Sequence, residues 1–166
     1  MIRVDTARLL LSANGENIRC AIGRGGAVSA DGKREGDGAT PLGRWPILAA
    51  LLQPDRTDAP KTMLPWRWMR PSDGWSDDPA DPCYNRPVSH PHRFGAERLW
   101  REDAAYDFVI VLGHNSDPVM RGAGSAIFWH VAQADFRPTE GCVAIEKAQF
   151  DRLLPILQPG SIMEIV

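Results

Sequence analysis

Cys142 stands in a sequence context that suits a catalytic thiol. It follows Gly141 in the run PTEGCV, residues 138–143. A glycine before a cysteine permits a sharp turn that presents the thiol and consecutive amide groups toward one point. The pattern therefore indicates a nucleophile with an oxyanion hole. It is also compatible with a small buried apolar residue, since free cysteine is among the most buried residue types.

His130 is the candidate base for that thiol. The thiolate is the attacking species, so a cysteine becomes effective when a neighbouring base takes its proton. His130 lies near the end of a predicted strand and precedes Cys142 by a short loop. The alternative is a core histidine whose ring nitrogens are satisfied by hydrogen bonds.

The other histidines carry weaker signals. His114 follows the apolar run 106–113, so it could face the same cleft as His130, or it could be a strand-end histidine bonded to the backbone. His90 and His92 flank a proline and have no acidic or thiol ligand at the usual spacing. We therefore expect no metal site and no cofactor.

The elements that must position these residues are mostly strands. Residues 8–22 read as two strands around an Asn14-Gly15 turn, and residues 45–52, 106–113, 125–132 and 161–166 have the composition of further strands. The glycine-rich stretch 23–43 predicts a loop, or a loop between short strands. Residues 146–157 place their large apolar side chains on one helical face, with Pro155 weakening the last turn.

Residues 53–101 are expected to be an irregular insertion. They contain most of the prolines and four of the tryptophans. Proline lacks the amide donor that a central strand needs, so aromatic side chains should pin this segment to the body of the protein. Its length exceeds that of a simple connection, which favours a role in lining the substrate site.

The whole chain, residues 1–166, is expected to form one mainly β domain with one clear helix. A net charge of -2 gives no reason to expect nucleic acid as a partner, and no apolar run is long enough to span a membrane. Three widely spaced cysteines fit neither a disulfide framework nor a paired metal site. The first residues do not read as an export signal, so we expect a cytoplasmic protein unless the start is truncated. The oligomeric state is left open.

The order of motifs resembles the L,D-transpeptidase (YkuD-like) catalytic domain. The chain carries TPLGRWPI at residues 40–47, then His130, then TEGCV at residues 139–143. The resemblance spans roughly residue 8 to the C-terminus. It implies a β-sandwich with a helix after the cysteine, Cys142 as nucleophile, His130 as base, and Gly141 and Cys142 amides as the oxyanion hole. Thr139, at the Ser/Thr position of the signature, is expected to contact substrate.

Three departures from the family signature concern the rim of the site. Glu140 replaces a histidine, Val131 replaces a glycine, and Ala144 replaces an arginine two places after the cysteine. A substrate carboxylate must then be bound by another arginine, since a guanidinium binds a carboxylate in a bidentate way. Our candidates are Arg137, Arg121 and Arg86, each of which is also compatible with a solvated surface residue.

The resemblance implies peptidoglycan stem peptides as substrates. We expect an L,D-carboxypeptidase that removes the terminal D-alanine through a thioester on Cys142 and acts in cell-wall recycling. One alternative is an L,D-transpeptidase that forms cross-links. A second is a non-catalytic peptidoglycan-binding domain in which Cys142 is simply buried.

Overall fold

The computed structural model describes all residues, 1–166, and the protein is mainly β, as predicted. One nine-stranded sheet dominates the fold. Its strands are β1 (Ile2–Asp5), β2 (Leu10–Ala13), β3 (Glu16–Ala21), β6 (Gly43–Leu52), β7 (Trp66–Trp68), β11 (Phe108–Leu112), β12 (Phe128–Val131), β13 (Val143–Ile145) and β14 (Ile162–Ile165).

The main sheet closes on itself. The strand order is β11-β12-β13-β3-β2-β1-β14-β6-β7, and β6 also pairs with β11. The long strand β6 achieves this because its first half pairs with β14 and its second half with β11. The two layers of the expected sandwich are thus joined by continuous hydrogen bonding, and only β7 lies outside the ring.

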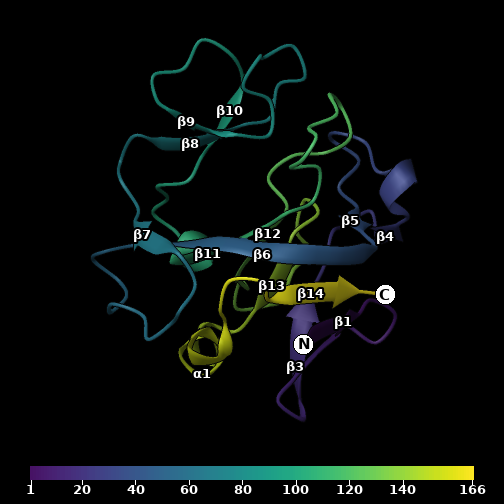
Figure 1. Ribbon diagram of the computed structural model, residues 1–166, viewed down its shortest axis with the longest axis vertical. Coiled ribbons are helices and arrows are strands. Elements are labelled where there is room, and N and C mark those ends of the chain that lie inside the picture. Colours follow the sequence, from purple (N-terminus) through teal and green to yellow (C-terminus); the bar gives the residue numbers. More distant parts are fainter.

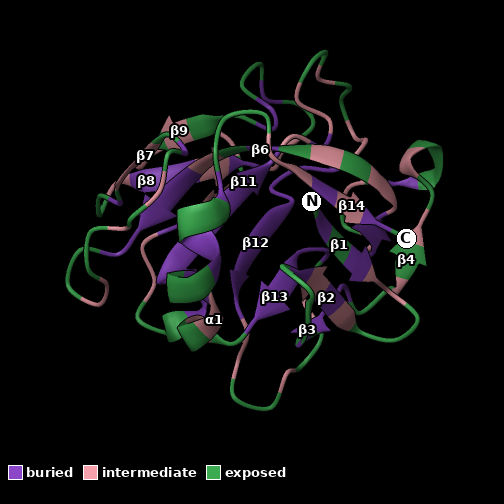
Figure 2. Ribbon diagram, turned by 60° about the horizontal axis from the view of Figure 1, so that its bottom comes forward, coloured by how far each residue is buried: buried purple, intermediate pink, exposed green.

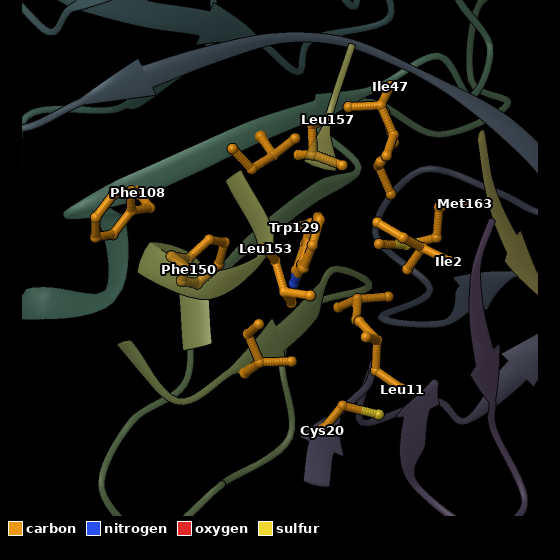
Figure 3. Close-up of a cluster of buried hydrophobic side chains, with 14 of the residues drawn as sticks. Ile2, Leu11, Cys20, Ile47, Phe108, Trp129, Phe150, Leu153, Leu157 and Met163 are labelled. Carbon is orange, nitrogen blue, oxygen red and sulfur yellow. The ribbon is translucent and has the colours of Figure 1, made fainter. Parts of the chain in front are cut away.

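The interior of the ring is a core of 25 buried hydrophobic residues. Helix α1 (Lys147–Leu153) contributes Phe150 to this core, where its ring stacks on Phe108 at 4.9 Å between centroids and lies 5.2 Å from Trp129. Figure 3 shows these rings together with Leu153 and Leu157. In Figure 2, α1 turns its buried residues toward the sheet and its exposed residues away from it.

The insertion is more ordered than predicted. Besides β7 it contains the small antiparallel sheet β10-β8-β9, formed by Asp73–Ser76 (β8), Pro87–Ser89 (β9) and Ala96–Arg98 (β10). Figure 1 shows this sheet at the end of the molecule opposite α1. Such short strands among prolines carry little periodicity, which explains why the sequence indicated only irregular structure.

The predicted hairpin is confirmed, with Asn14 and Gly15 at φ values of 52° and 80° between β2 and β3. The strands expected at 45–52, 106–113, 125–132 and 161–166 are confirmed as β6, β11, β12 and β14. The glycine-rich stretch holds the two-residue strands β4 (Ala27–Val28) and β5 (Thr40–Pro41), which pair with each other. Helix α1 ends at Leu153, and a 3-10 turn over Leu154–Ile156 carries Pro155.

Outside the insertion, two more strands were not predicted. Strand β1 is four residues long and β13 only three, too short for a recognisable pattern. Strand β13 lies between Cys142 and α1, so the cysteine leads into a strand rather than directly into the helix. No helix in the protein has the length and apolar character needed to cross a membrane.

Candidate active site

Strands β12 and β13 bring Cys142 and His130 to the same face of the main sheet. The strands are parallel neighbours in which Trp129 pairs with Val143 and His130 with Ala144. Side chains alternate between the two faces of a strand. Trp129 therefore points into the main core, whereas Phe128 and His130 point to the other face, on which Cys142 also packs.

That face borders a cavity of about 530 Å³. Cys142 and His130 both line it, although their exposed fractions are only 7% and 8%. The region of the small sheet also lines the cavity, through Asp77, which follows β8, and Glu97 of β10. The volume lies in the range typical of small-ligand sites.

The Cys142 thiol is protonated at rest. Burial raises the pKa of Cys142 to about 12, and the Glu97 carboxylate acts in the same direction. The sulfur donates to the Ala126 carbonyl at 3.2 Å and accepts from the Phe128 amide at 3.3 Å. The thiol has no hydrogen bond to His130, so the nucleophile must rotate before it can give its proton to that base.

His130 is neutral at rest and correctly protonated for a base. Its Nδ1 donates to the carbonyl oxygen of Val131 at 2.9 Å, which leaves the Nε2 lone pair free. Burial lowers the pKa of His130 to about 4, even though the Val131 and Ala105 carbonyls favour the charged ring. The ring is held further by Tyr106, whose ring lies edge-on at 5.2 Å between centroids.

The turn before Cys142 requires glycine. Gly141 has a φ of +132°, and a Cβ atom there would lie 2.9 Å from the Ala39 carbonyl oxygen. The buried Thr40 fixes the turn from below: its hydroxyl donates to the Gly141 carbonyl at 2.9 Å and accepts from the Gly23 amide at 2.8 Å. The upstream TPLG segment therefore supports the nucleophile.

Of the two amides at the turn, that of Gly141 is used in a structural hydrogen bond and that of Cys142 is free. The Gly141 amide donates to the Thr139 hydroxyl at 3.1 Å, and that hydroxyl donates to the Cys142 carbonyl at 2.7 Å. The Cys142 amide has no hydrogen-bond partner. Of the two amides expected to form the oxyanion hole, only that of Cys142 is free, while Gly141 and Thr139 shape the turn.

The expected substrate-binding residues are only partly brought together. Thr139 and Arg137 line the cavity, and Arg137 forms an ion pair with Asp135 at 3.0 Å. Arg121 does not line it; its guanidinium donates instead to the Pro79 and Ala80 carbonyls.

His114 and Arg86 lie in a second cavity of about 200 Å³, on the other side of Trp75 and Phe128. His114 Nε2 donates to the Ala123 carbonyl, and Arg86 donates to the Ser116 carbonyl. The structure thus places His114 outside the cavity of His130, at a strand end with its ring bonded to the backbone, which is the other of the two readings of the sequence. Arg86 and Arg121 also lie outside the cavity of Cys142, and both donate to backbone carbonyls.

Several cavity residues were missed by the sequence reasoning. They are the acidic residues Glu35, Asp77 and Glu97, together with Arg101 and Tyr106. Arg101 pairs with Asp103, and its guanidinium lies 4.8 Å above the Tyr106 ring. These residues come from loops and short strands far apart in sequence, and none of them belongs to a recognisable local motif.

The departure at Glu140 has a structural counterpart. Its carboxylate pairs with the Arg24 guanidinium at 2.9 Å on the exposed rim of the cavity.

Of the two histidines that flank Pro91, His92 pairs with Asp81 at 2.6 Å. No group of three histidine, cysteine or carboxylate side chains is arranged to hold a metal ion.

Comparison with solved structures finds L,D-transpeptidases. The one from Xylanimonas cellulosilytica is 12% identical with a TM-score of 0.47, the alignment covering 99% of this chain and 59% of that one. L,D-transpeptidase 1 of Mycobacterium tuberculosis is 11% identical with a TM-score of 0.44, covering 100% and 60%. The protein described here thus spans less than two thirds of the length of these chains. A search of curated proteins finds no match.

A comparison with models of protein families identifies the family of this chain. The family model described as "YkuD: L,D-transpeptidase catalytic domain" matches residues 1–165, nearly the full length. This agrees with the resemblance seen in the motifs at residues 40–47 and 139–143 and with the mainly β fold. The chain therefore belongs to the YkuD family and is an L,D-transpeptidase-type catalytic domain.

Proposed function

We propose that this domain attacks the bond between the L-centre of a diamino acid and a terminal D-alanine in peptidoglycan stem peptides. The observation that carries the proposal is that Cys142 and His130 line one cavity in a domain of this family. A thiol and a neutral imidazole in a shared cavity are the parts that cysteine acyl transfer requires. Their presence argues against a non-catalytic binding domain.

The reaction begins from a neutral pair. When substrate fills the cavity, the Cys142 thiol leaves the Ala126 carbonyl and gives its proton to Nε2 of His130. The thiolate attacks the peptide carbonyl, and the free Cys142 amide donates to the resulting oxyanion. His130 then protonates the departing amine of D-alanine, and a thioester remains on the sulfur.

Water is the second nucleophile in this proposal, which makes the protein an L,D-carboxypeptidase. A cavity of about 530 Å³ accommodates one small ligand more readily than two peptides, so water enters more easily than a second stem. Cross-linking by L,D-transpeptidation is the second candidate, because the matching family is described by that activity.

A recycling role depends on where the protein acts, and we propose the cytoplasm. Fractionation of the source cells tests this part separately. Recovery with cytoplasmic markers supports action on recycled fragments. Recovery with periplasmic or surface markers contradicts it and favours cross-linking.

Mass spectrometry of the protein mixed with a synthetic tetrapeptide, with and without an amine acceptor, tests the reaction. We expect tripeptide and free D-alanine in both samples, a transient acyl adduct on Cys142, and no product from Cys142→Ala. A dimeric product in the acceptor sample would replace hydrolysis by transpeptidation. Absence of any adduct or product would remove the enzymatic proposal itself.

A further inference from the structure

Three carboxylates form one wall of the active-site cavity and have no cationic partner. They belong to Glu35 in the loop before β5, Asp77 after β8 and Glu97 in β10. None of the three takes part in an ion pair, although ten ion pairs occur elsewhere in the protein. We call these residues the acidic wall.

The acidic wall is oriented by neutral groups. The Glu35 carboxylate accepts from the Tyr84 hydroxyl at 2.5 Å and from the Ser125 hydroxyl at 2.7 Å. Glu97 accepts from the Tyr106 hydroxyl. Hydroxyl donors fix the direction of a carboxylate but leave its negative charge in place.

The two arginines that line the cavity do not neutralise the wall. The Arg101 guanidinium is paired with Asp103, and that of Arg137 is paired with Asp135. Each arginine therefore already has its own carboxylate. The charge of Arg101 also acts to lower the pKa of Glu97, although the guanidinium is hydrogen-bonded to Asp103 and not to Glu97. Glu35 and Asp77 have no ion-pair partner, so the wall keeps a net negative charge.

Two members of the acidic wall, Asp77 and Glu97, have raised pKa values. Burial raises the pKa of Asp77, and the nearby Glu35 carboxylate adds to the shift. Burial likewise raises the pKa of Glu97, with Asp77 and Glu35 contributing in the same direction. A cation bound among these groups relieves this repulsion, because an opposite charge within a few ångström favours the ionised form of a carboxyl group.

The same cavity contains the groups that mark where a reacting carbonyl lies. The His130 side chain is 8% exposed and lines the cavity, and its Nε2 has no hydrogen-bond partner. The Cys142 thiol lines the cavity too, and the Cys142 amide is unpaired. A ligand that fills the cavity thus has its reacting carbonyl at Cys142 and a second group at the acidic wall.

We propose that the acidic wall binds the free side-chain ammonium of the diamino residue whose carbonyl Cys142 attacks. This inference rests on the proposed function and names its specificity determinant. Because one cavity of about 530 Å³ holds both the nucleophile and the wall, a single substrate residue can place its carbonyl at Cys142 and its ammonium at the wall. Charge-assisted hydrogen bonds from an ammonium to Asp77 and Glu97 select a diamino acid over an apolar residue with the same carbon chain.

The test uses two tetrapeptides that differ only at the third residue, L-lysine in one and L-norleucine in the other. For the wild-type protein we expect kcat/KM for D-alanine release to be about 10- to 100-fold higher with lysine. In Asp77→Asn and Glu35→Gln this preference should fall severalfold, with most of the change in the lysine peptide. Glu146→Gln, an exposed carboxylate outside the cavity, is the matched control and should keep the wild-type preference.

Equal kcat/KM values for the two peptides would overturn the ammonium site and leave the proposed function standing. If neither peptide is cleaved, the proposed function fails. A second measurement then still tests whether the acidic wall attracts ammonium groups. That measurement is the rate at which Cys142 forms a disulfide with methanethiosulfonate reagents, in which the thiolate displaces methanesulfinate. It needs no turnover.

The reagents carry a 2-aminoethyl group, which is cationic, or a 2-sulfonatoethyl group, which is anionic. The exposed Cys83 is replaced by serine in all samples, and rates are normalised to those of free cysteine. We expect the cationic reagent to be favoured by about tenfold or more, and Asp77→Asn to reduce that ratio. A ratio near one in the wild-type background would show that the wall does not attract ammonium groups and would overturn the inference.

Discussion

The two faces of strand β12 have opposite chemical character. Trp129 and Val131 point into the core of 25 hydrophobic residues, against β13 and α1. Phe128 and His130 point to the other face, where His130 meets the cavity and its acidic wall. Four consecutive residues therefore serve two environments, and the period of two in a strand is what separates them.

The comparison teaches that the cavity face is built for reactivity and the core face for stability. On the cavity face, burial lowers the pKa of His130 to about 4 and raises that of Cys142 to about 12, so both groups are held neutral. On the core face, close packing of rings removes apolar surface from water, the dominant favourable contribution to folding. Changes on the two faces should therefore affect different measurements.

Cys142→Ala should give the largest effect and should act on the cavity face alone. The nucleophile is lost, so we expect D-alanine release to fall by about 10³-fold or more. The free energy of unfolding should change by only about 1 kcal/mol, since the substitution is small. D-alanine release and denaturant unfolding, measured on the same sample, check this. Release at wild-type rate would identify a different nucleophile.

Phe150→Ala should act on the core face alone. It removes the ring that packs on Phe108 and Trp129, so we expect a loss of about 3–5 kcal/mol in unfolding free energy. The rate per folded molecule should remain near that of the wild type. Chemical denaturation measures the first quantity and active-site titration with a tetrapeptide the second. Asp151→Ala, exposed on the same helix, is the control and should stay within about 0.5 kcal/mol.

Thr40→Val should affect both faces, because Thr40 joins the turn of the nucleophile to the body of the protein. The change leaves the Gly23 amide and the Gly141 carbonyl without their partner in a buried place. We expect a loss of about 2–4 kcal/mol in unfolding free energy and a lower rate of D-alanine release. Thr40→Ser keeps the hydroxyl and should retain most of both. If valine is tolerated in both assays, the hydroxyl is not what holds the turn.

The pH dependence of Cys142 alkylation should test whether the Cys142 thiol and the His130 imidazole are both neutral at rest. Because burial raises the pKa of Cys142 to about 12, the thiolate fraction grows as pH rises and is small at neutral pH. The iodoacetamide rate in a Cys83→Ser background should therefore increase about tenfold per pH unit between pH 7 and 9. A rate that is flat across this range would indicate a thiolate–imidazolium pair at rest and contradict the neutral pair.

Arg24→Gln should give the smallest effect. The ion pair between Arg24 and Glu140 lies on the exposed rim, with side-chain exposures of 57% and 77%. Exposed pairs contribute about 0.2–1 kcal/mol, so unfolding free energy and D-alanine release should both stay near wild type. A large loss of activity without loss of stability would show that the rim at Glu140 contacts substrate.

The sequence predicted the elements with strong periodicity and the residues carried by a motif. Strands β11 and β12 are continuous apolar runs, and the Asn14-Gly15 turn has its own backbone chemistry, so each was recognisable locally. Cys142 and His130 were found because a glycine, a thiol and an imidazole occur in a fixed order. Their shared cavity follows from the pairing of β12 with β13.

The rest of the site depends on contacts that leave no local pattern. Asp77 and Glu97 of the insertion meet Glu35 of the glycine-rich loop at the cavity, and the insertion contacts β12 through the rings of Trp75 and Phe128. Arg86, Arg121 and His114 lie outside the cavity of Cys142, and the sequence does not reveal which way a side chain points in a loop or after a strand ends. Closure of the ring through β6 and β11 was equally hidden, because it requires two strands separated by the whole insertion to pair.

That closure has a consequence for how such domains diversify. Leu52 ends β6 and Phe108 begins β11, and these two residues are cross-strand partners. The chain therefore leaves the ring of strands and re-enters it at adjoining positions. Everything between them is a module whose two attachment points stay fixed whatever its length. Exchanging this module between homologues offers a route to new substrate preferences while the main sheet, which carries Cys142 and His130, stays unchanged.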